Sequence, residues 1–399
     1  MLAGLERELE DEPFLVVGVH SPKFTNERDE TMVREAVRRY GVTHPVVVDP
    51  GRRIWDEWGV NAWPTLVVVD ETGEVVAAGS GEPAPDALRA LVRDLLPATR
   101  PAPLPLRPEP APPGSLSYPG KVIAARDRLY VADTGHGQVV ETDLDGNEQR
   151  RFDGFSHPNG LALAGRVLYV ADTGDHAIRR VDLESGAAET VADGLRSPWD
   201  LAWDGELLYI AMAGSHQIWF HDPAAAETDV FAGTGHELRR DGPAAGAALA
   251  QPSGLALLDG SLYVADSEIS SIRAIDDLGG LPTVRTVCGS GELFGFGDRD
   301  GFGAEVLLQH PIGIAPGEGV LYVADSFNHK VKRVDPATGE CRTLFGGLER
   351  LPETVEPGFW EPEGLACAAG ILYVADTNNH RAVAIDLESG ERKTLLGGS

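Results

Sequence analysis

The sequence contains few cysteines: three in 399 residues, at positions 288, 341 and 367. They are odd in number, far apart in the chain and without the spacing of metal ligands, so neither a disulfide framework nor a zinc site is expected. We expect each of them to be a small buried apolar residue. Residues 1–99 contain no cysteine at all, which excludes thiol exchange by that stretch as it is written.

Basic residues are also scarce, with 34 Lys and Arg against 62 Asp and Glu and a net charge of −28. Nucleic acids and anionic membranes bind basic surfaces, so we expect neither as a partner. No apolar run approaches the roughly 18 residues of a membrane-spanning helix. The start, MLAGLERELEDEP, lacks the basic and apolar regions of a signal peptide. The sequence therefore predicts a cytoplasmic protein that is kept soluble by its acidity.

A proline-rich stretch, PAPLPLRPEPAPPG, divides the chain in two. Such a composition predicts an extended, semi-rigid spacer. We therefore expect a first domain at 1–99, a linker at 100–116 and a second domain at 117–399.

The first domain alternates apolar strand patterns with helical patterns, which predicts an α/β layer. The strands are expected at 14–20, 45–49 and 65–70, with a return strand after the last one. The longest helix is expected to begin at Asn26 as its N-cap and to end at Gly41.

The second domain is built from repeats. The phrase LYVAD, or its variant LYIAM, occurs six times, and each copy follows a proline at one fixed spacing. The proline and the last residue of the phrase pair as Pro119/Asp133, Pro158/Asp172, Pro198/Met212, Pro252/Asp266, Pro311/Asp325 and Pro362/Asp376. Each copy reads as four short strands, which is typical of a β-propeller blade.

We therefore predict an all-β propeller of six blades. The turn between the second and third strands and the connection from one blade to the next emerge on one face of such a disk. Two long insertions, at 233–251 and 289–309, also fall in these connections, so we expect binding on that face. Whether the ring is closed by a strand from the linker or by packing of the first blade against the last stays open.

Two resemblances follow from these motifs. The pattern P-x-G-L-A followed by L-Y-V-A-D-[TS]-x-N-H resembles the NHL repeat. The stretch VVGVHSPKFTNERD with Trp63-Pro64-Thr65 resembles thioredoxin-like thiol–disulfide oxidoreductases. In this order, the two resemble the bacterial relatives of NHL repeat-containing protein 2. The resemblance implies a partial thioredoxin-like α/β domain followed by a six-bladed NHL propeller.

The thioredoxin-like resemblance also implies a missing piece. In that fold a central strand lies between the strands expected at 14–20 and 65–70 and is followed by a Cys-x-x-Cys at the start of a helix; here the strand and the cysteine turn would precede Met1. Unpaired central strands leave buried backbone groups without partners. Either the two flanking strands close on each other, or the protein begins further upstream; we expect an incomplete N-terminus.

The candidate site residues fall into three groups. Trp63, Pro64 and Thr65 are expected to form a cis-proline corner beside a substrate groove, the alternative being a rigid start of a strand. The residues that recur in the repeats are expected to be structural rather than catalytic or metal-binding. This second group comprises Asp133, Asp172, Asp266, Asp325, Asp376, His176, His216, His329 and His380.

The third group consists of departures from the repeat just after the corner prolines: Asn159, Trp199, Asp200 and Glu363. We expect these at the mouth of the central channel, where they form either a ligand pocket or a water-filled opening. The loop GFGDRDGFG lacks the ligand ladder of a calcium site and the Gly-Lys-[Ser/Thr] of a phosphate loop. No metal, cofactor or catalytic residue is predicted.

Three functions are compatible with these patterns. The first is a non-catalytic binding or scaffold protein that presents the propeller face to a protein or peptide. The second is a thiol–disulfide oxidoreductase whose cysteines lie upstream of the printed start. The third is a metal-dependent, lactonase-like hydrolase, with Glu363, Asn159 and Asp200 as the only candidate ligands. We favour the first; the oligomeric state is not predicted.

Overall fold

The computed structural model describes residues 2–24, 26–81, 85–96, 114–346 and 358–398. The chain separates into two compact units, Met1–Pro112 and Pro113–Ser399, and each is described by itself. The predicted linker, 100–116, lies for the most part outside the described residues.

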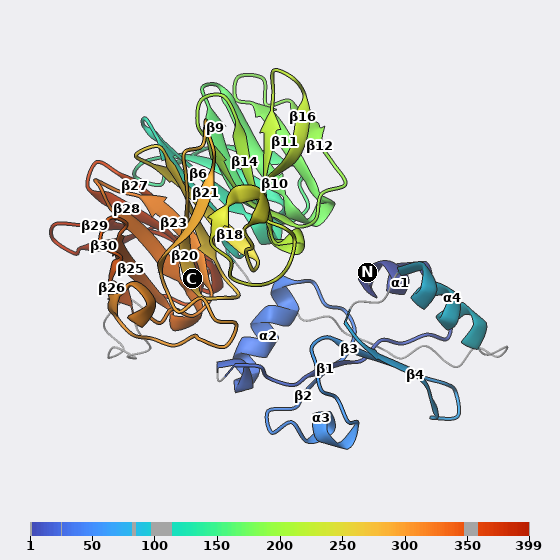
Figure 1. Cartoon of the computed structure of the whole chain (residues 1–399). Coiled ribbons are helices and arrows are strands. Elements are labelled where there is room, and N and C mark those ends of the chain that lie inside the picture. The colour runs from blue at the N-terminus through green and yellow to red at the C-terminus, as the bar shows by residue number, and fades with distance from the viewer. Residues whose placement is uncertain (1, 25, 82–84, 97–113, 347–357, 399) are drawn as a thin grey trace. The chain divides into compact units, whose positions relative to one another are not determined.

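The first unit contains short helices and two separate pairs of strands (Figure 1). β1 pairs with β2 in parallel, and β3 pairs with β4 antiparallel. The two pairs share no sheet, so the single α/β layer expected from the sequence is not formed. The elements are α1 (Leu2–Glu8), β1 (Gly18–His20), η1 (Asn26–Arg28), α2 (Glu30–Arg39), β2 (Val46–Val48), α3 (Arg53–Glu57), β3 (Thr65–Val69), β4 (Val75–Ser80) and α4 (Pro85–Leu95).

A small core joins α1 and α4 to β3. Leu5 and Leu9, one helical turn apart, pack against Leu88 and Val92, with Leu66 of β3 beside them. The other strand pair remains open: Val19 is 45% exposed and Val47 is 41% exposed. Within the described residues, β1 and β3 each have a hydrogen-bonded neighbour on one side only, so each leaves one edge of backbone groups unpaired.

The N-cap of the long helix differs from the sequence prediction. Asn26 lies in the 3₁₀ turn η1, and the side chain of Asp29 accepts a hydrogen bond from the Thr31 N–H at 2.8 Å. The Glu27 carboxylate accepts bonds from two preceding backbone N–H groups, which holds the turn apart from the helix. The prediction of Asn26 as the N-cap is therefore wrong. Gly41, at φ +58°, follows the helix end as expected.

The second unit is a propeller of six blades, each with four consecutive antiparallel strands (Figure 1). Blades one to three consist of β5 (Pro119–Ala125), β6 (Arg128–Asp133), β7 (Gln138–Asp143) and β8 (Glu148–Asp153); β9 (Pro158–Ala164), β10 (Val167–Asp172), β11 (Ala177–Asp182) and β12 (Ala188–Ala192); β13 (Pro198–Trp203), β14 (Leu208–Met212), β15 (Gln217–Asp222) and β16 (Glu227–Ala232).

Blades four to six consist of β18 (Pro252–Leu258), β19 (Ser261–Asp266), β20 (Ser271–Asp276) and β21 (Thr283–Cys288); β23 (Pro311–Pro316), β24 (Leu321–Asp325), β25 (Lys330–Asp335) and β26 (Glu340–Gly346); β27 (Pro362–Ala368), β28 (Ile371–Asp376), β29 (Arg381–Asp386) and β30 (Arg392–Gly397). The two insertions add a short fifth strand, β17 (Gly242–Pro243) beside β21 and β22 (Gly301–Phe302) beside β26.

The repeated aspartates hold the corner of their own blade. Each is fully buried, and its Oδ1 accepts a bond of 2.6–2.7 Å from the backbone N–H two residues before the corner proline. Its Oδ2 lies 2.6–3.6 Å from a cation or an amide of the third strand. Blade three replaces both partners with apolar side chains, Met212 and Trp219, which lie in one core cluster. Because the acid and its cation are lost together, neither side chain leaves a buried charge behind.

The turn after each aspartate forms hydrogen bonds with the next blade. The residue before every corner proline has a φ of +48 to +56°, a region that a residue preceding proline rarely adopts. His176, His216, His329 and His380 each accept, through Nδ1, the N–H of that residue in the following blade at 3.1–3.3 Å. In five blades a Thr or Ser hydroxyl donates to the proline carbonyl at 2.6–2.8 Å.

The ring closes by the same contacts. Tyr118 N–H of blade one donates to His380 of blade six, and Thr377 Oγ1 donates to the Pro119 carbonyl. Val122 and Val131 share a buried cluster with Tyr373. All four strands of blade one follow each other in the chain, so the first and last blades meet by packing rather than by exchange of a strand within the described residues.

A pH dependence follows from His329, which is 3% exposed and whose burial lowers its pKa to about 4. Because the unfolded chain binds this proton near the ordinary pKa of 6.5, the stabilisation is complete above pH 6.5 and is lost as pH falls toward 4. His329→Asn keeps a side chain that tolerates positive φ and removes the titration. In urea unfolding, we expect the wild type to lose about 2 kcal/mol relative to the variant between pH 7 and pH 5; a pH-independent difference would contradict this.

Candidate functional site

We define the loop face as the side of the propeller that carries the starts of the inner strands, the turns after the second strands and the insertions 233–251 and 289–309. The antiparallel order of every blade places these segments at one end of the strands. The insertions lead directly into Pro252 and Pro311, the starts of β18 and β23. The four positions at which the sequence departs from the repeat, Asn159, Trp199, Asp200 and Glu363, all lie on this face.

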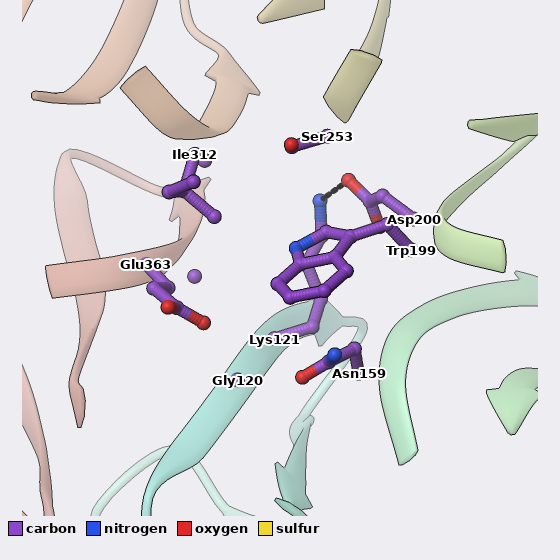
Figure 2. A pocket seen from close by; sticks show the side chains of 10 residues that line it. Gly120, Lys121, Asn159, Trp199, Asp200, Ser253, Ile312 and Glu363 are labelled. Carbon is purple, nitrogen blue, oxygen red and sulfur yellow. Dashed lines mark hydrogen bonds and ion pairs between the residues drawn. The ribbon is translucent and has the colours of Figure 1, made fainter. Parts of the chain in front are cut away.

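The structure brings the four predicted mouth residues together. Asn159, Trp199, Asp200 and Glu363 line one notch around the central channel, with Lys121 among them (Figure 2). Its free volume is about 20 Å³, which is room for about one water molecule. In this conformation the mouth therefore holds no small organic ligand, and of the two alternatives the water-sized opening describes the geometry.

Two of the lining residues form an ion pair. Lys121 Nζ of blade one lies 2.5 Å from Asp200 Oδ2 of blade three, and both side chains are buried (Figure 2). Asp200 also accepts bonds from the N–H groups of Leu201 and Leu255, at 2.8 and 2.9 Å. Burial raises the pKa of this carboxyl, and the Lys121 ammonium opposes that shift. Asp200 is thus engaged within the protein rather than open to a ligand.

Lys121 and Asp200 occupy positions that are glycine in the other four blades. A Cβ added at Gly313 would lie 1.5 Å from the Glu363 carbonyl oxygen, and one at Gly254 would lie 2.4 Å from that of Ile312. Glycine therefore lets neighbouring inner strands approach closely. Where the repeat departs from glycine, the two side chains reach across the channel instead. The sequence shows both departures but not that they meet.

The remaining mouth residues are less enclosed by partners. Asn159 Oδ1 accepts a bond from Thr134 Oγ1 at 3.3 Å, and Trp199 is half-buried with its indole reaching into the notch (Figure 2). Among the described residues, no three His, Cys, Asp or Glu side chains are grouped as metal ligands. With Asp200 held by Lys121, the geometry offers no support for the hydrolase hypothesis.

The loop containing Asp298 and Asp300 is structural. Both carboxylates bind Lys332 Nζ, at 3.1 and 3.0 Å, and Asp300 also accepts from the Thr343 N–H at 2.9 Å. Burial alone would raise the pKa of Asp300, but these donors hold it below its ordinary value. The first insertion repeats the arrangement: Asp241 binds Arg273 at 2.6 Å and Thr286. Each insertion thus caps the outer edge of the blade that follows it.

The proline corner lies in the first unit. The Trp63–Pro64 peptide is cis, Trp63 Nε1 donates to the Ser21 carbonyl at 2.9 Å, and Thr65 Oγ1 donates to the Ala62 carbonyl at 2.7 Å. No cysteine belongs to this unit. Cys288 and Cys341, distant in the sequence, lie in one buried cluster between blades four and five. The Cys288 thiol donates a hydrogen bond to Cys341, and this bond together with burial raises the pKa of Cys288.

The comparisons with known proteins agree with the repeat pattern. No family model matches the chain. It is 39% identical over 99% of its length to "Protein SUPPRESSOR OF QUENCHING 1, chloroplastic" of Arabidopsis thaliana, of which it covers 43%. It is 35% identical over 97% of its length to NHL repeat-containing protein 2 of Homo sapiens, of which it covers 64%. The chain therefore spans less than two thirds of either relative.

Two further likenesses cover part of the chain each. A stretch of 52 residues is 36% identical to thiol-disulfide oxidoreductase ResA of Halalkalibacterium halodurans, covering 13% of this chain and 30% of that protein. A solved structure of a Bacteroides thetaiotaomicron protein of unknown function matches with a TM-score of 0.54 and 19% identity, covering 67% of this chain and 68% of that one. At that identity the match concerns the fold alone.

The predicted NHL repeats and six-bladed propeller are confirmed, and homologues of NHL repeat-containing protein 2 match nearly the whole chain. The thioredoxin-like nature of the first unit stays a prediction. In the part of the chain that the structure describes, none of the helices has the length and apolar character needed to cross a bilayer. The cytoplasmic location also stays a prediction; the Arabidopsis relative is described as chloroplastic.

The ion pair across the channel yields a stability prediction. Lys121→Met leaves the Asp200 carboxylate buried without a counter-charge, so we expect a loss of about 3 kcal/mol in the free energy of unfolding. The double variant K121M/D200N should lose less than the sum of the single variants, because no buried charge remains. Urea unfolding at pH 7 measures both.

Lys393→Met provides the control for this ion pair, since Lys393 is an exposed lysine whose partner, Asp145, is also exposed. We expect it to change stability by less than about 0.5 kcal/mol. If Lys121→Met lowered the free energy of unfolding no more than the control does, the ion pair would not stabilise the propeller.

Proposed function

From the similarity to NHL repeat-containing protein 2, we propose that this chain is a non-catalytic binding or scaffold protein whose loop face receives a protein or peptide partner. The observation that carries the proposal is the concentration of departures from the repeat on one face. Both insertions, the mouth residues Asn159, Trp199 and Glu363, and the cross-channel pair all lie there. The turns on the opposite face carry no such additions within the described residues.

The closed channel mouth favours a macromolecular partner over a small molecule. The notch holds about 20 Å³, whereas sites for small ligands measure roughly 300–1,000 Å³. A protein or peptide needs only the raised rim of loops, because protein interfaces are broad and shallow and depend on a few anchoring side chains. Trp199 and the exposed side chains of the insertions are of the kind that serves as anchors.

A site-specific photo-cross-linking experiment tests which face binds. Benzoylphenylalanine is placed at Asp175 or Glu237 on the loop face, and at Asp145 or Glu206 in the turns of the opposite face; all four residues are exposed. We expect partner adducts in the native cells only from the loop-face positions. Adducts from the opposite face alone, or equally from both faces, would contradict the proposal.

A second function is favoured by the open strand edges of the first unit. β1 and β3 each lack a neighbour on one side, and a strand inserted there would satisfy both edges. If that strand carried a Cys-x-x-Cys at the start of a helix, the unit would be a thiol–disulfide oxidoreductase, since a helix N-terminus lowers a thiol pKa. The similarity to ResA supports this candidate, and the printed residues 1–99 contain no cysteine that could act.

The intact mass and N-terminal peptides of the protein from its native locus test the second function. A mass above 42.5 kDa with a Cys-x-x-Cys in the N-terminal peptides is the expected result if it holds. A protein that begins at Met1 would rule it out and leave the binding role unaffected.

A further inference from the structure

The two insertions are variants of one structure, so their differences can be compared position by position. Asp241 of the first corresponds to Asp300 of the second: each precedes a glycine that begins the added strand, and each binds the buried cation of the blade. The neighbouring bridges Arg240–Ala248 and Arg299–Leu307 also correspond. Counting from these anchors, Leu238 corresponds to Gly297 and Arg239 to Asp298.

A polar contact in blade five becomes apolar in blade four. In blade five, Asn328 Nδ2 of the repeat turn donates to the Gly297 carbonyl at 2.7 Å and to Asp325 at 2.8 Å. In blade four the asparagine position is Ile269, fully buried, and the glycine position is Leu238. Both residues line the same pocket. The hydrogen bond of blade five is thus replaced in blade four by two apolar side chains, Leu238 and Ile269, which we call the apolar floor of the pocket.

A charge is reversed next to that floor. In blade five, Asp298 is paired with Lys330 and Lys332. In blade four the corresponding residue is Arg239, and Ser271 stands in place of Lys330. The stem of Arg239 lies directly against Gly291, where an added Cβ would come within 2.1 Å of its Cδ. Within the described residues Arg239 forms no ion pair, and its exposed guanidinium shares the pocket with one carboxylate, that of Glu292.

These changes coincide in a pocket between the two insertions. It has a volume of about 430 Å³ and is lined by Leu238, Arg239, Ile269, Gly291, Glu292, Leu293 and Phe294. Phe294 forms part of the wall although 74% of it is exposed. The volume lies within the range of ligand sites, and it is far larger than that of the notch at the channel mouth.

We propose that this pocket binds a peptide segment in which a large apolar side chain is next to an acidic one. The apolar side chain packs on Leu238, beside the buried Ile269, and the carboxylate pairs with Arg239. This inference rests on the proposed function and names the anchor of the partner. Arginine favours a carboxylate because its planar donors match both oxygens. We assign the carboxylate to an internal Asp or Glu, because the pocket lies open between two loops along which a chain can continue.

Peptide binding to the full chain tests the inference by fluorescence anisotropy. The probe is a labelled Gly/Ser peptide, acetylated and amidated at its ends, with Phe-Asp at its centre; Phe-Asn and Ser-Asp versions serve as controls. We expect Phe-Asp to bind at least about tenfold more tightly than either control. Arg239→Ala should weaken Phe-Asp binding by a similar factor and leave Phe-Asn binding unchanged.

Two matched variants separate the pocket from general effects. Arg240→Ala removes the adjacent exposed arginine, which does not line the pocket, and should bind as the wild type does. The double variant L238G/I269N installs the blade-five residues and should lose Phe-Asp binding while the urea midpoint shows that the protein stays folded.

The inference is overturned if Phe-Asp binds no better than Ser-Asp, if Arg239→Ala has no effect, or if only peptides with a free C-terminal carboxylate bind. Failure of the proposed function looks different. If Arg239→Glu abolishes peptide binding while partner cross-links from the loop face persist, the inference fails, because the partner does not need the pocket, and the proposed function stands. Cross-links confined to the opposite face remove the proposed function itself.

Discussion

The propeller depends on six strained corners, one at the start of each inner strand. Each corner places a residue with positive φ directly before a proline, which costs roughly 1–3 kcal/mol where nothing stabilises it. The preceding blade supplies the compensation, through a histidine or serine acceptor for the N–H and a Thr or Ser donor for the proline carbonyl at most joints. The repeated histidines and hydroxyl residues therefore stabilise the joints between blades, and the ring closes through the same two kinds of contact.

The architecture of the propeller could be predicted from the sequence because its determinants are local and recur at fixed spacing. The cross-channel pair could not, because Lys121 and Asp200 are 79 residues apart and only the curvature of the ring brings them together. Likewise Cys288 and Cys341 share a buried cluster only because blades four and five pack together. The correspondence of the insertions was visible, since an Asp-Gly pair stands at one distance before both corner prolines, but its meaning required the buried cations.

In the first unit the sequence pattern predicts where strands form but not which strands pair with one another. The strand positions near 45–49 and 65–70 were predicted within a residue or two, yet the strands form two separate pairs instead of one sheet. Pairing depends on which strand edges meet, and within the described residues each of these four strands has one edge without a neighbouring strand. Val19 of β1 and Val47 of β2 are accordingly left exposed.

The residues common to the blades stabilise the blade corners and the joints between blades. We therefore assign function to the residues and insertions that depart from the repeat. Hydrogen–deuterium exchange of the full chain, alone and bound to its native partner, tests this assignment most directly. The account predicts slower exchange on binding in 233–251 and 289–296, with the opposite-face turns at 143–147 and 204–207 unchanged. Protection of those turns, with both insertions exchanging as in the free protein, would contradict it.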